Sequence, residues 1–152
     1  MLGFRYTEEL HGGFYFLSTP VDERAADLRL DVAVPDVAAF GQLHTAELRG
    51  PLKLEGFADA RGADVQGKLV LDLEGQRALY ELSFTGGDDA HPVGRYRLRG
   101  YKQFELLNLV DSFTLVRASL YDADAREIGR AMLRFDARGN WASLVRSFRL
   151  AW

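Results

Sequence analysis

The sequence predicts an all-β antiparallel fold of eight to ten strands, closed or nearly closed as a barrel, with two short helices that plug or flank it. Apolar residues alternate along many short segments, and turn-forming residues separate these segments at intervals typical of barrels and sandwiches. A pattern of alternating strand, capped helix and second strand also occurs twice, at 28–54 and 131–152. Hairpin spacing alone does not separate a barrel from a two-sheet sandwich, which is the alternative.

Two strand segments are predicted in the N-terminal part of the chain. Segment 3–17 is a strand pair or one bent strand, because the paired glycines Gly12 and Gly13 permit a bulge or a tight turn. Segment 18–26 is expected to be a polar loop. Apolar and polar residues then alternate over 28–34, which is typical of a strand buried on one face.

A short capped helix is predicted after this strand. Pro35 ends the strand, since proline lacks the backbone N–H that a sheet ladder uses. Asp36 supplies a side-chain oxygen that can cap a helix N-terminus. Val37 and Phe40 are three residues apart, so we expect both to face inward.

Six further strands and four connecting turns are predicted in the middle of the chain. The strands lie near 46–57, 66–74, 77–84, 94–103, 112–122 and 127–136. The turns contain Gly and Asp, which tolerate the left-handed or self-bonded backbone that hairpins need. They lie at 59–62, 74–75, 86–89 and 122–125.

The C-terminal segment carries both helical and strand periodicity. Apolar residues from Trp141 to Phe148 are spaced as on one face of a helix, whereas those from Phe148 to Trp152 alternate. Asn140 is a suitable helix cap. We therefore predict a short helix at about 141–146 and a closing strand after it.

Composition and charge limit the class of protein. The 152 residues suffice for a core, and we predict a single domain over 1–152. No cysteine occurs, which excludes disulfides and thiolate metal sites. A net charge of −3 without a basic stripe argues against nucleic acid as a partner. The sequence shows neither an apolar run of roughly 18 residues nor an apolar signal segment, so we expect a cytoplasmic protein without a membrane span.

Several segments together resemble a small β-rich accessory module found with some bacterial oxidoreductases. The segments are Phe-Arg-Tyr-Thr-Glu-Glu-Leu-His-Gly at 4–12, Val-Pro-Asp-Val-Ala-Ala-Phe at 34–40, Leu-Arg-Gly at 48–50, Tyr-Arg-Leu-Arg-Gly-Tyr-Lys at 96–102 and Asp-Ser-Phe-Thr-Leu at 111–115. They are similar to runs of a module that accompanies glucose-methanol-choline, cholesterol-oxidase-like enzymes. The resemblance covers nearly the whole chain.

The resemblance implies an accessory or ligand-binding role beside lipid- or sterol-type metabolism in bacteria, with an oxidoreductase as partner. It does not imply oxidase activity, because the chain has no flavin domain and no Gly-x-Gly-x-x-Gly dinucleotide motif. The module itself has no assigned activity.

No motif in the chain carries a catalytic mechanism or a metal site. His11 precedes two glycines, as at the oxyanion side of lipases, but a Gly-x-Ser-x-Gly elbow is missing, so we interpret the segment as a turn. Asp88, Asp89 and His91 crowd one loop, yet nothing fixes their geometry, and a solvated turn is the preferred interpretation. We therefore predict no catalytic residue, no metal and no cofactor, and an enzyme is only a third hypothesis.

Three arginines alternate along one face of the predicted strand at 94–103, opposite Tyr96: Arg95, Arg97 and Arg99. One interpretation is a solvated face, where arginine stems cover apolar neighbours. The other is a stripe that binds anions or an acidic partner, because guanidinium groups bind carboxylates and phosphates in a bidentate manner.

Two functions follow from these observations. A lipocalin- or calycin-like barrel can hold one small ligand, which predicts a non-enzymatic binding module for an apolar or amphipathic, lipid- or sterol-like molecule. Its expected walls are inward aromatic residues, with an arginine or lysine at the mouth. The predicted ligand-binding residues are Tyr80, Phe84, Tyr96, Arg97, Tyr101, Lys102 and Phe113. The alternative is an accessory module that docks an oxidoreductase through a strand edge or the arginine face; the ligand and the oligomeric state stay open.

Overall fold

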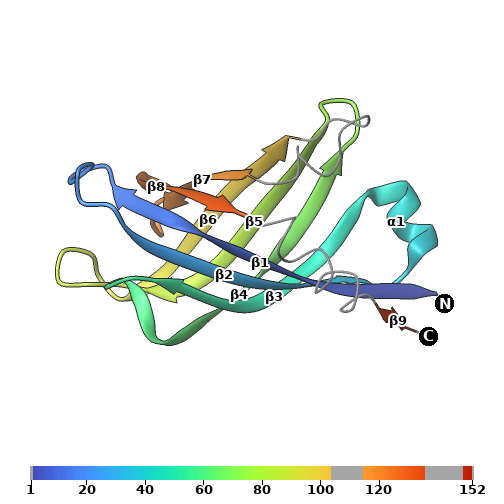
Figure 1. Cartoon of the computed structure of the whole chain (residues 1–152), viewed down its shortest axis with the longest axis horizontal. Helices are drawn as coiled ribbons and strands as arrows, with labels where there is room; N and C mark the ends of the chain where they lie inside the picture. Colours follow the sequence, from blue (N-terminus) through green and yellow to red (C-terminus); the bar gives the residue numbers. More distant parts are fainter. Residues whose placement is uncertain (1, 104–114, 136–148, 152) are drawn as a thin grey trace.

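Nine strands and one short helix form the part of the chain that the structure, a computed structural model, describes: residues 2–103, 115–135 and 149–151 (Figure 1). The elements are β1 (Gly3–Phe16), β2 (Arg24–Val34), α1 (Val37–Leu43), β3 (Thr45–Leu54), β4 (Ala58–Asp72), β5 (Arg77–Gly86), β6 (Gly94–Gln103), β7 (Leu115–Tyr121), β8 (Glu127–Arg134) and β9 (Arg149–Ala151).

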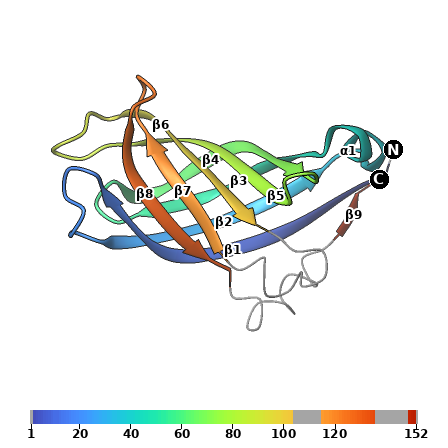
Figure 2. The ribbon, with the colours of Figure 1, turned by 90° about the horizontal axis from the view of Figure 1, so that it is seen from above.

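The strands β1 to β8 close into an antiparallel barrel, which confirms the predicted fold class over the two-sheet alternative. Each strand pairs with the next along the chain, and β1 pairs with both β2 and β8, so the sheet closes on itself (Figure 2). The ninth strand, β9, pairs with the first residues of β1 and is the predicted closing strand. This up-and-down arrangement is consistent with a lipocalin-like barrel.

The first strand is one bent strand, as one of the two interpretations of 3–17 predicted. It pairs with β2 over 4–14 and with β8 over 11–16, so both edges of β1 are occupied near Gly12. A Cβ atom on Gly12 would overlap the carbonyl oxygen of Met132. Position 12 therefore requires glycine because the backbones of β1 and β8 approach closely there. Gly12 lies within the strand and not in a turn.

Alternation places one face of every barrel strand in a packed core. In β5 and β6, for example, Leu82, Phe84, Tyr96 and Leu98 are all buried. The void at the centre of the barrel, lined by residues such as Leu10, measures only about 10 Å³. That is roughly the space for a single water molecule.

The helix α1 has the predicted cap but packs less deeply than expected. The Asp36 carboxylate accepts a hydrogen bond from the backbone N–H of Ala38 at 3.0 Å. The ring of Phe40 packs edge-on against Phe4, with centroids 6.1 Å apart. The inward orientation predicted for Val37 was wrong: its exposed fraction is 39%, and α1 has no buried residue. The helix therefore lies against the end of the barrel and does not plug it.

The element boundaries differ from the prediction in several places: the strand predicted at 46–57 ends at Leu54, and the strand predicted at 66–74 already begins at Ala58. The loop predicted at 18–26 is shorter, because β2 begins at Arg24. The turn predicted at 59–62 lies inside β4, because the chain already turns at 55–57, where the Asp59 carboxylate accepts the N–H of Gly56. The turn residues at 74–75, 86–89 and 122–125 do lie at strand connections.

The second predicted helix, at about 141–146, lies outside the described residues. Within the described part of the chain, no helix is long and apolar enough to cross a membrane.

Candidate functional site

A buried polar bridge crosses the barrel near the end where β1 begins and β6 ends. Glu8 of β1 meets Lys102 of β6, with 3.2 Å between Nζ and Oε2. The hydroxyl of Tyr80, from β5, donates a hydrogen bond to the same carboxylate oxygen at 3.1 Å. Because β1 and β5 lie on opposite sides of the closed sheet, these contacts span the interior. We call Glu8, Tyr80 and Lys102 the polar bridge.

The polar bridge is electrostatically compensated. Lys102 is 1% exposed and Glu8 is 8% exposed, and the ammonium lies 5.5 Å from the centre of the Tyr80 ring. Burial, and then the negative charge of Glu8, hold the pKa of Tyr80 well above its usual value. The same two causes raise the pKa of Tyr6. Both phenols therefore stay neutral, which lets Tyr80 donate to the carboxylate.

The raised pKa of Tyr80 predicts a loss of stability in alkaline solution. The phenol keeps its proton in the folded barrel, whereas the unfolded chain releases it near the ordinary pKa of 10.0. The free energy of unfolding should therefore be unaffected by this group below pH 10 and fall above it by about 1.4 kcal/mol per pH unit. Urea unfolding at about pH 9, 10 and 11 measures the slope, which should be shallower in Tyr80→Phe. Equal slopes would contradict the assignment.

An aromatic cluster closes the opposite end of the barrel. The ring of Phe57 lies 5.2 Å from Phe16 and 4.8 Å from Tyr96. Phe84 contacts both Phe57 and Tyr96. His91 stacks on Phe16 with centroids 4.3 Å apart. We call these five residues the aromatic plug, because they fill the end where β1 ends and β6 begins.

The loop that carries His91 is held by local hydrogen bonds. One carboxylate oxygen of Asp88 accepts the backbone N–H groups of Ala90 and His91 and lies 2.8 Å from the Nδ1 atom of His91. The predicted turn is therefore present, but it is not solvated as expected, because the side chains of Asp88 and His91 are only 15% and 19% exposed. The turn predicted at His11 was wrong, because His11 lies within β1 and its Nδ1 atom faces the Asp27 carboxylate of β2 at 2.6 Å.

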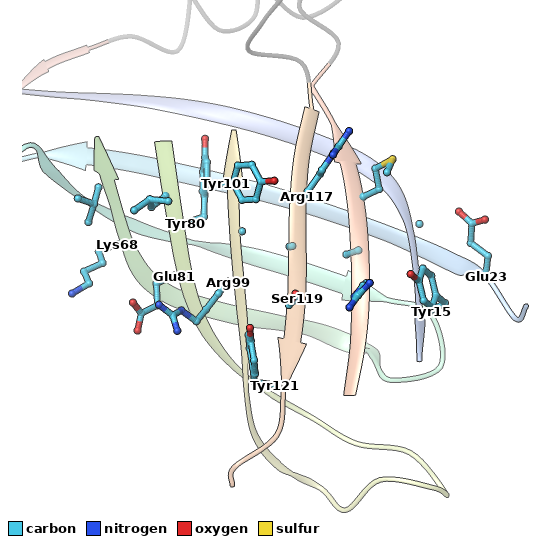
Figure 3. A pocket seen from close by; sticks show the side chains of 18 residues that line it. Tyr15, Glu23, Lys68, Tyr80, Glu81, Arg99, Tyr101, Arg117, Ser119 and Tyr121 are labelled. Carbon is cyan, nitrogen blue, oxygen red and sulfur yellow. The ribbon is translucent and has the colours of Figure 1, made fainter. Parts of the chain in front are cut away.

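The outer face of the barrel carries a groove of about 920 Å³ (Figure 3). It crosses six neighbouring strands, β4 to β8 and then β1, and twelve of its lining residues form two rows in continuous register. The polar row consists of Lys68, Glu81, Arg99, Ser119, Arg130 and Tyr15. The apolar row consists of Val70, Leu79, Tyr101, Arg117, Met132 and Gly13, with Arg117 as its one charged member.

Small inward residues lie directly behind the groove. Gly100 of β6 pairs with Ala118 of β7, which pairs with Ala131 of β8. A Cβ on Gly100 would lie 2.8 Å from that of Ala118, so the side chains inside this wall are as small as possible. Gly100 and Ala118 line both the groove and the central void. The wall is therefore thin here, and we attribute the hollow of the outer face to these small residues.

The groove combines apolar surface with an excess of positive charge, although Arg130 pairs with Glu127, with 2.9 Å between Nε and Oε1. Leu79, Tyr101 and Met132 are 37%, 37% and 47% exposed and lie in one row, so their exposed apolar surface is concentrated in the groove. Arg99 and Arg117 form no ion pair with any residue of the described part of the chain. The charged side chains that line the groove are Lys68, Arg99, Arg117, Arg130, Glu23 and Glu81, so basic groups outnumber acidic ones.

No protein-family model, curated protein or solved structure matches this chain. The resemblance to a module of bacterial oxidoreductases stays a prediction, because no match bears on it.

The structure separates the six described residues among the seven that were predicted to bind a ligand. Tyr80 and Lys102 meet in the polar bridge, whereas Phe84 and Tyr96 belong to the aromatic plug at the other end. Tyr101 lies in the apolar row of the groove.

The two remaining residues lie elsewhere. Arg97 is on the outer face of β6, as the alternation with Tyr96 predicted, but it does not line the groove. Phe113 lies outside the described residues. Lys102 points inward, whereas Arg97, Arg99 and Tyr101 of the same strand point outward.

Sequence reasoning missed Glu8 and most of the groove. Glu8 has a local signal, since Phe4, Tyr6 and Leu10 set an alternation that places position 8 inside. Arg117 and the rest of the two rows have no comparable signal, because they come together only through the register of six strands.

Proposed function

We propose that the protein is a non-enzymatic binding module that docks an acidic protein partner in the outer groove. The observation that supports this best is the pair of rows that cross six strands with exposed apolar and basic side chains. Tyrosine, methionine and arginine are enriched at protein interfaces, and this groove contains Tyr101, Met132 and three arginines.

The charge of the groove determines the chemistry of the partner. The whole chain has a net charge of −3, yet basic groups dominate the groove. Arg99 and Arg117 lie on neighbouring strands and have guanidinium groups without a carboxylate in the described chain. Carboxylates of a partner would supply charge-assisted hydrogen bonds to both. An oxidoreductase with an acidic surface is the specific partner that the resemblance suggests.

A small amphipathic ligand inside the barrel is the second candidate. The polar bridge favours it, since Lys102 and Tyr80 are groups that could orient a polar head in an apolar interior. The central void of about 10 Å³ argues against it, because ligand pockets measure roughly 300–1,000 Å³. The outer groove is much larger than this void, so we place the proposed binding site in the groove.

Charge reversal in the groove tests the proposed function. A matched pair of variants is Arg99→Glu with Arg117→Glu, and Arg29→Glu with Arg49→Glu; the second pair lies on exposed outer positions of β2 and β3. The partner is first recovered by crosslinking in the native source and identified, and its Kd is then measured with purified proteins by calorimetry. The groove variant should weaken binding by about 30-fold, or roughly 1 kcal/mol for each arginine.

The control variant should bind the partner like the natural chain. Equal Kd values for the two variants would contradict the proposed surface, and so would recovery of this chain alone from its native source. Thermal unfolding of both variants, followed by circular dichroism, shows whether each keeps its fold.

A further inference from the structure

We propose that the partner presents an amphipathic α-helix that lies across the strands, with acidic residues spaced seven apart along one side. This inference rests on the proposed function and specifies the shape of the partner. It follows from three features of the groove: the backbone hydrogen bonds of its strands are already made to neighbouring strands, its length suits a helix, and its basic residues are regularly spaced.

The floor of the groove has no backbone groups to offer a partner strand. Each strand from β4 to β8 pairs with a neighbour on both sides, and β1 pairs with β8 and β2. Strand addition needs an exposed sheet edge, which a closed wall lacks. The partner is therefore recognised through side chains, and a helix suits this because its own backbone groups are already bonded.

The dimensions of the rows match those of a helix. Neighbouring strands are about 4.8 Å apart, so a row of six residues extends for roughly 24 Å along the curved wall of the barrel. A helix of about 16 residues has this length, and its pitch of about 5.4 Å places successive turns near successive strands. The two rows are two residues apart along each strand, roughly 7 Å, which fits the apolar stripe of a helix and the acidic stripe beside it.

The basic residues of the polar row occupy every second strand. Lys68 lies on β4, Arg99 on β6 and Arg130 on β8, while Glu81 and Ser119 lie between them. Arg130 also pairs with Glu127, but its side chain is 56% exposed, and such surface pairs are weak enough to be exchanged for a partner carboxylate. Two strand spacings amount to about 9.6 Å. Residues seven apart on a helix rise by about 10.5 Å on the same side. Acidic residues at i, i+7 and i+14 would therefore face the three basic residues, and an acidic residue midway between the first two would face Glu81.

A designed peptide tests this geometry. The probe has 16 residues, glutamates at positions 1, 8 and 15, a leucine stripe on the adjacent face and a lactam bridge on the far side that keeps it helical. One control peptide has the same composition with the glutamates five residues apart, which spreads them around the helix. A second control replaces the central residues with prolines and is extended. Fluorescence anisotropy measures the Kd of each peptide.

The seven-spaced helix should bind the natural chain at least tenfold more tightly than either control. Its binding should be lost in Arg99→Glu with Arg117→Glu and kept in Arg29→Glu with Arg49→Glu. If the extended peptide bound equally well, the proposal of a helical partner would be wrong, whereas the proposed docking of an acidic partner in the groove would be unaffected. If the control helix with glutamates five residues apart bound as tightly as the probe, the proposed spacing of seven residues between acidic side chains would be wrong.

Two further outcomes separate this inference from the proposed function. If no peptide binds but a native partner still depends on Arg99 and Arg117, the helix is wrong and the docking surface is right. If phosphatidylserine vesicles bind through these arginines and no protein partner does, both are wrong.

Discussion

Lys102→Ala is expected to lower the free energy of unfolding by about 3–5 kcal/mol. The substitution leaves the carboxylate of Glu8 in the barrel interior without its ammonium partner, whose nitrogen lies 3.2 Å away. A buried, uncompensated charge is among the most destabilising changes known for a folded domain. Urea unfolding near neutral pH, followed by circular dichroism, measures the effect.

Two control variants make this prediction specific to the polar bridge. Lys53→Ala removes an exposed lysine from β3 and should change stability by less than about 0.5 kcal/mol. Combining Lys102→Met with Glu8→Gln removes both charges, so most of the lost stability should return. A cost below about 1 kcal/mol for Lys102→Ala, or no recovery in the double variant, would contradict the compensated pair.

Phe57→Ala is expected to cost about 3–5 kcal/mol. Phe57 is 3% exposed and contacts Phe16, Phe84, Tyr96 and His91, so it is the central ring of the aromatic plug. Truncation removes its buried surface and leaves a cavity between the remaining rings. Differential scanning calorimetry should show a lower Tm and an unchanged single transition.

A matched truncation separates this effect from a general loss of hydrophobic surface. Leu43→Ala shortens an apolar side chain of α1 that is 70% exposed, so its Tm should stay close to that of the natural chain. Phe57→Leu keeps most of the side-chain volume, so its Tm should lie between those of Phe57→Ala and Leu43→Ala. If Phe57→Ala were as stable as Leu43→Ala, the plug would not close this end of the barrel.

The polar bridge and the aromatic plug together explain why the outer face is the better place for function. They occupy the interior toward its two ends, and the void lined by described residues between them measures about 10 Å³. The packed core of the described residues fixes the strands from which the outer side chains project, which favours recognition at the groove. The barrel is then a scaffold for the two rows.

Local patterns predicted much of the fold because they depend on neighbours in the chain. Alternation placed Arg95, Arg97 and Arg99 on one face of a strand, and β6 has them outside. Asp36 was predicted as a helix cap from its position after Pro35, and its carboxylate makes that hydrogen bond. The turn at 122–125 was predicted from its aspartates, and the Asp122 carboxylate accepts the N–H of Arg126.

The described residues of the predicted site do not lie together, for a physical reason that their residue types cannot reveal. Aromatic composition groups Tyr80 with Phe84, yet they lie four residues apart on β5 and face opposite ends of the interior. Tyr101 and Lys102 were both predicted to bind the ligand, but successive residues of a strand point to opposite faces. Glu8, the partner of Lys102, is 94 positions away in the chain.

The sequence by itself determined the strands, most of their turns and which side chains share a face, because the side-chain period of two is a local property of extended backbone. Only the tertiary structure decided that the sheet closes and in which register its strands meet. The groove depends on that register alone: a shift of one residue between β6 and β7 would separate Arg99 from Ser119 and Tyr101 from Arg117. Register is set by packing between distant segments, and so the two rows exist only in the folded barrel.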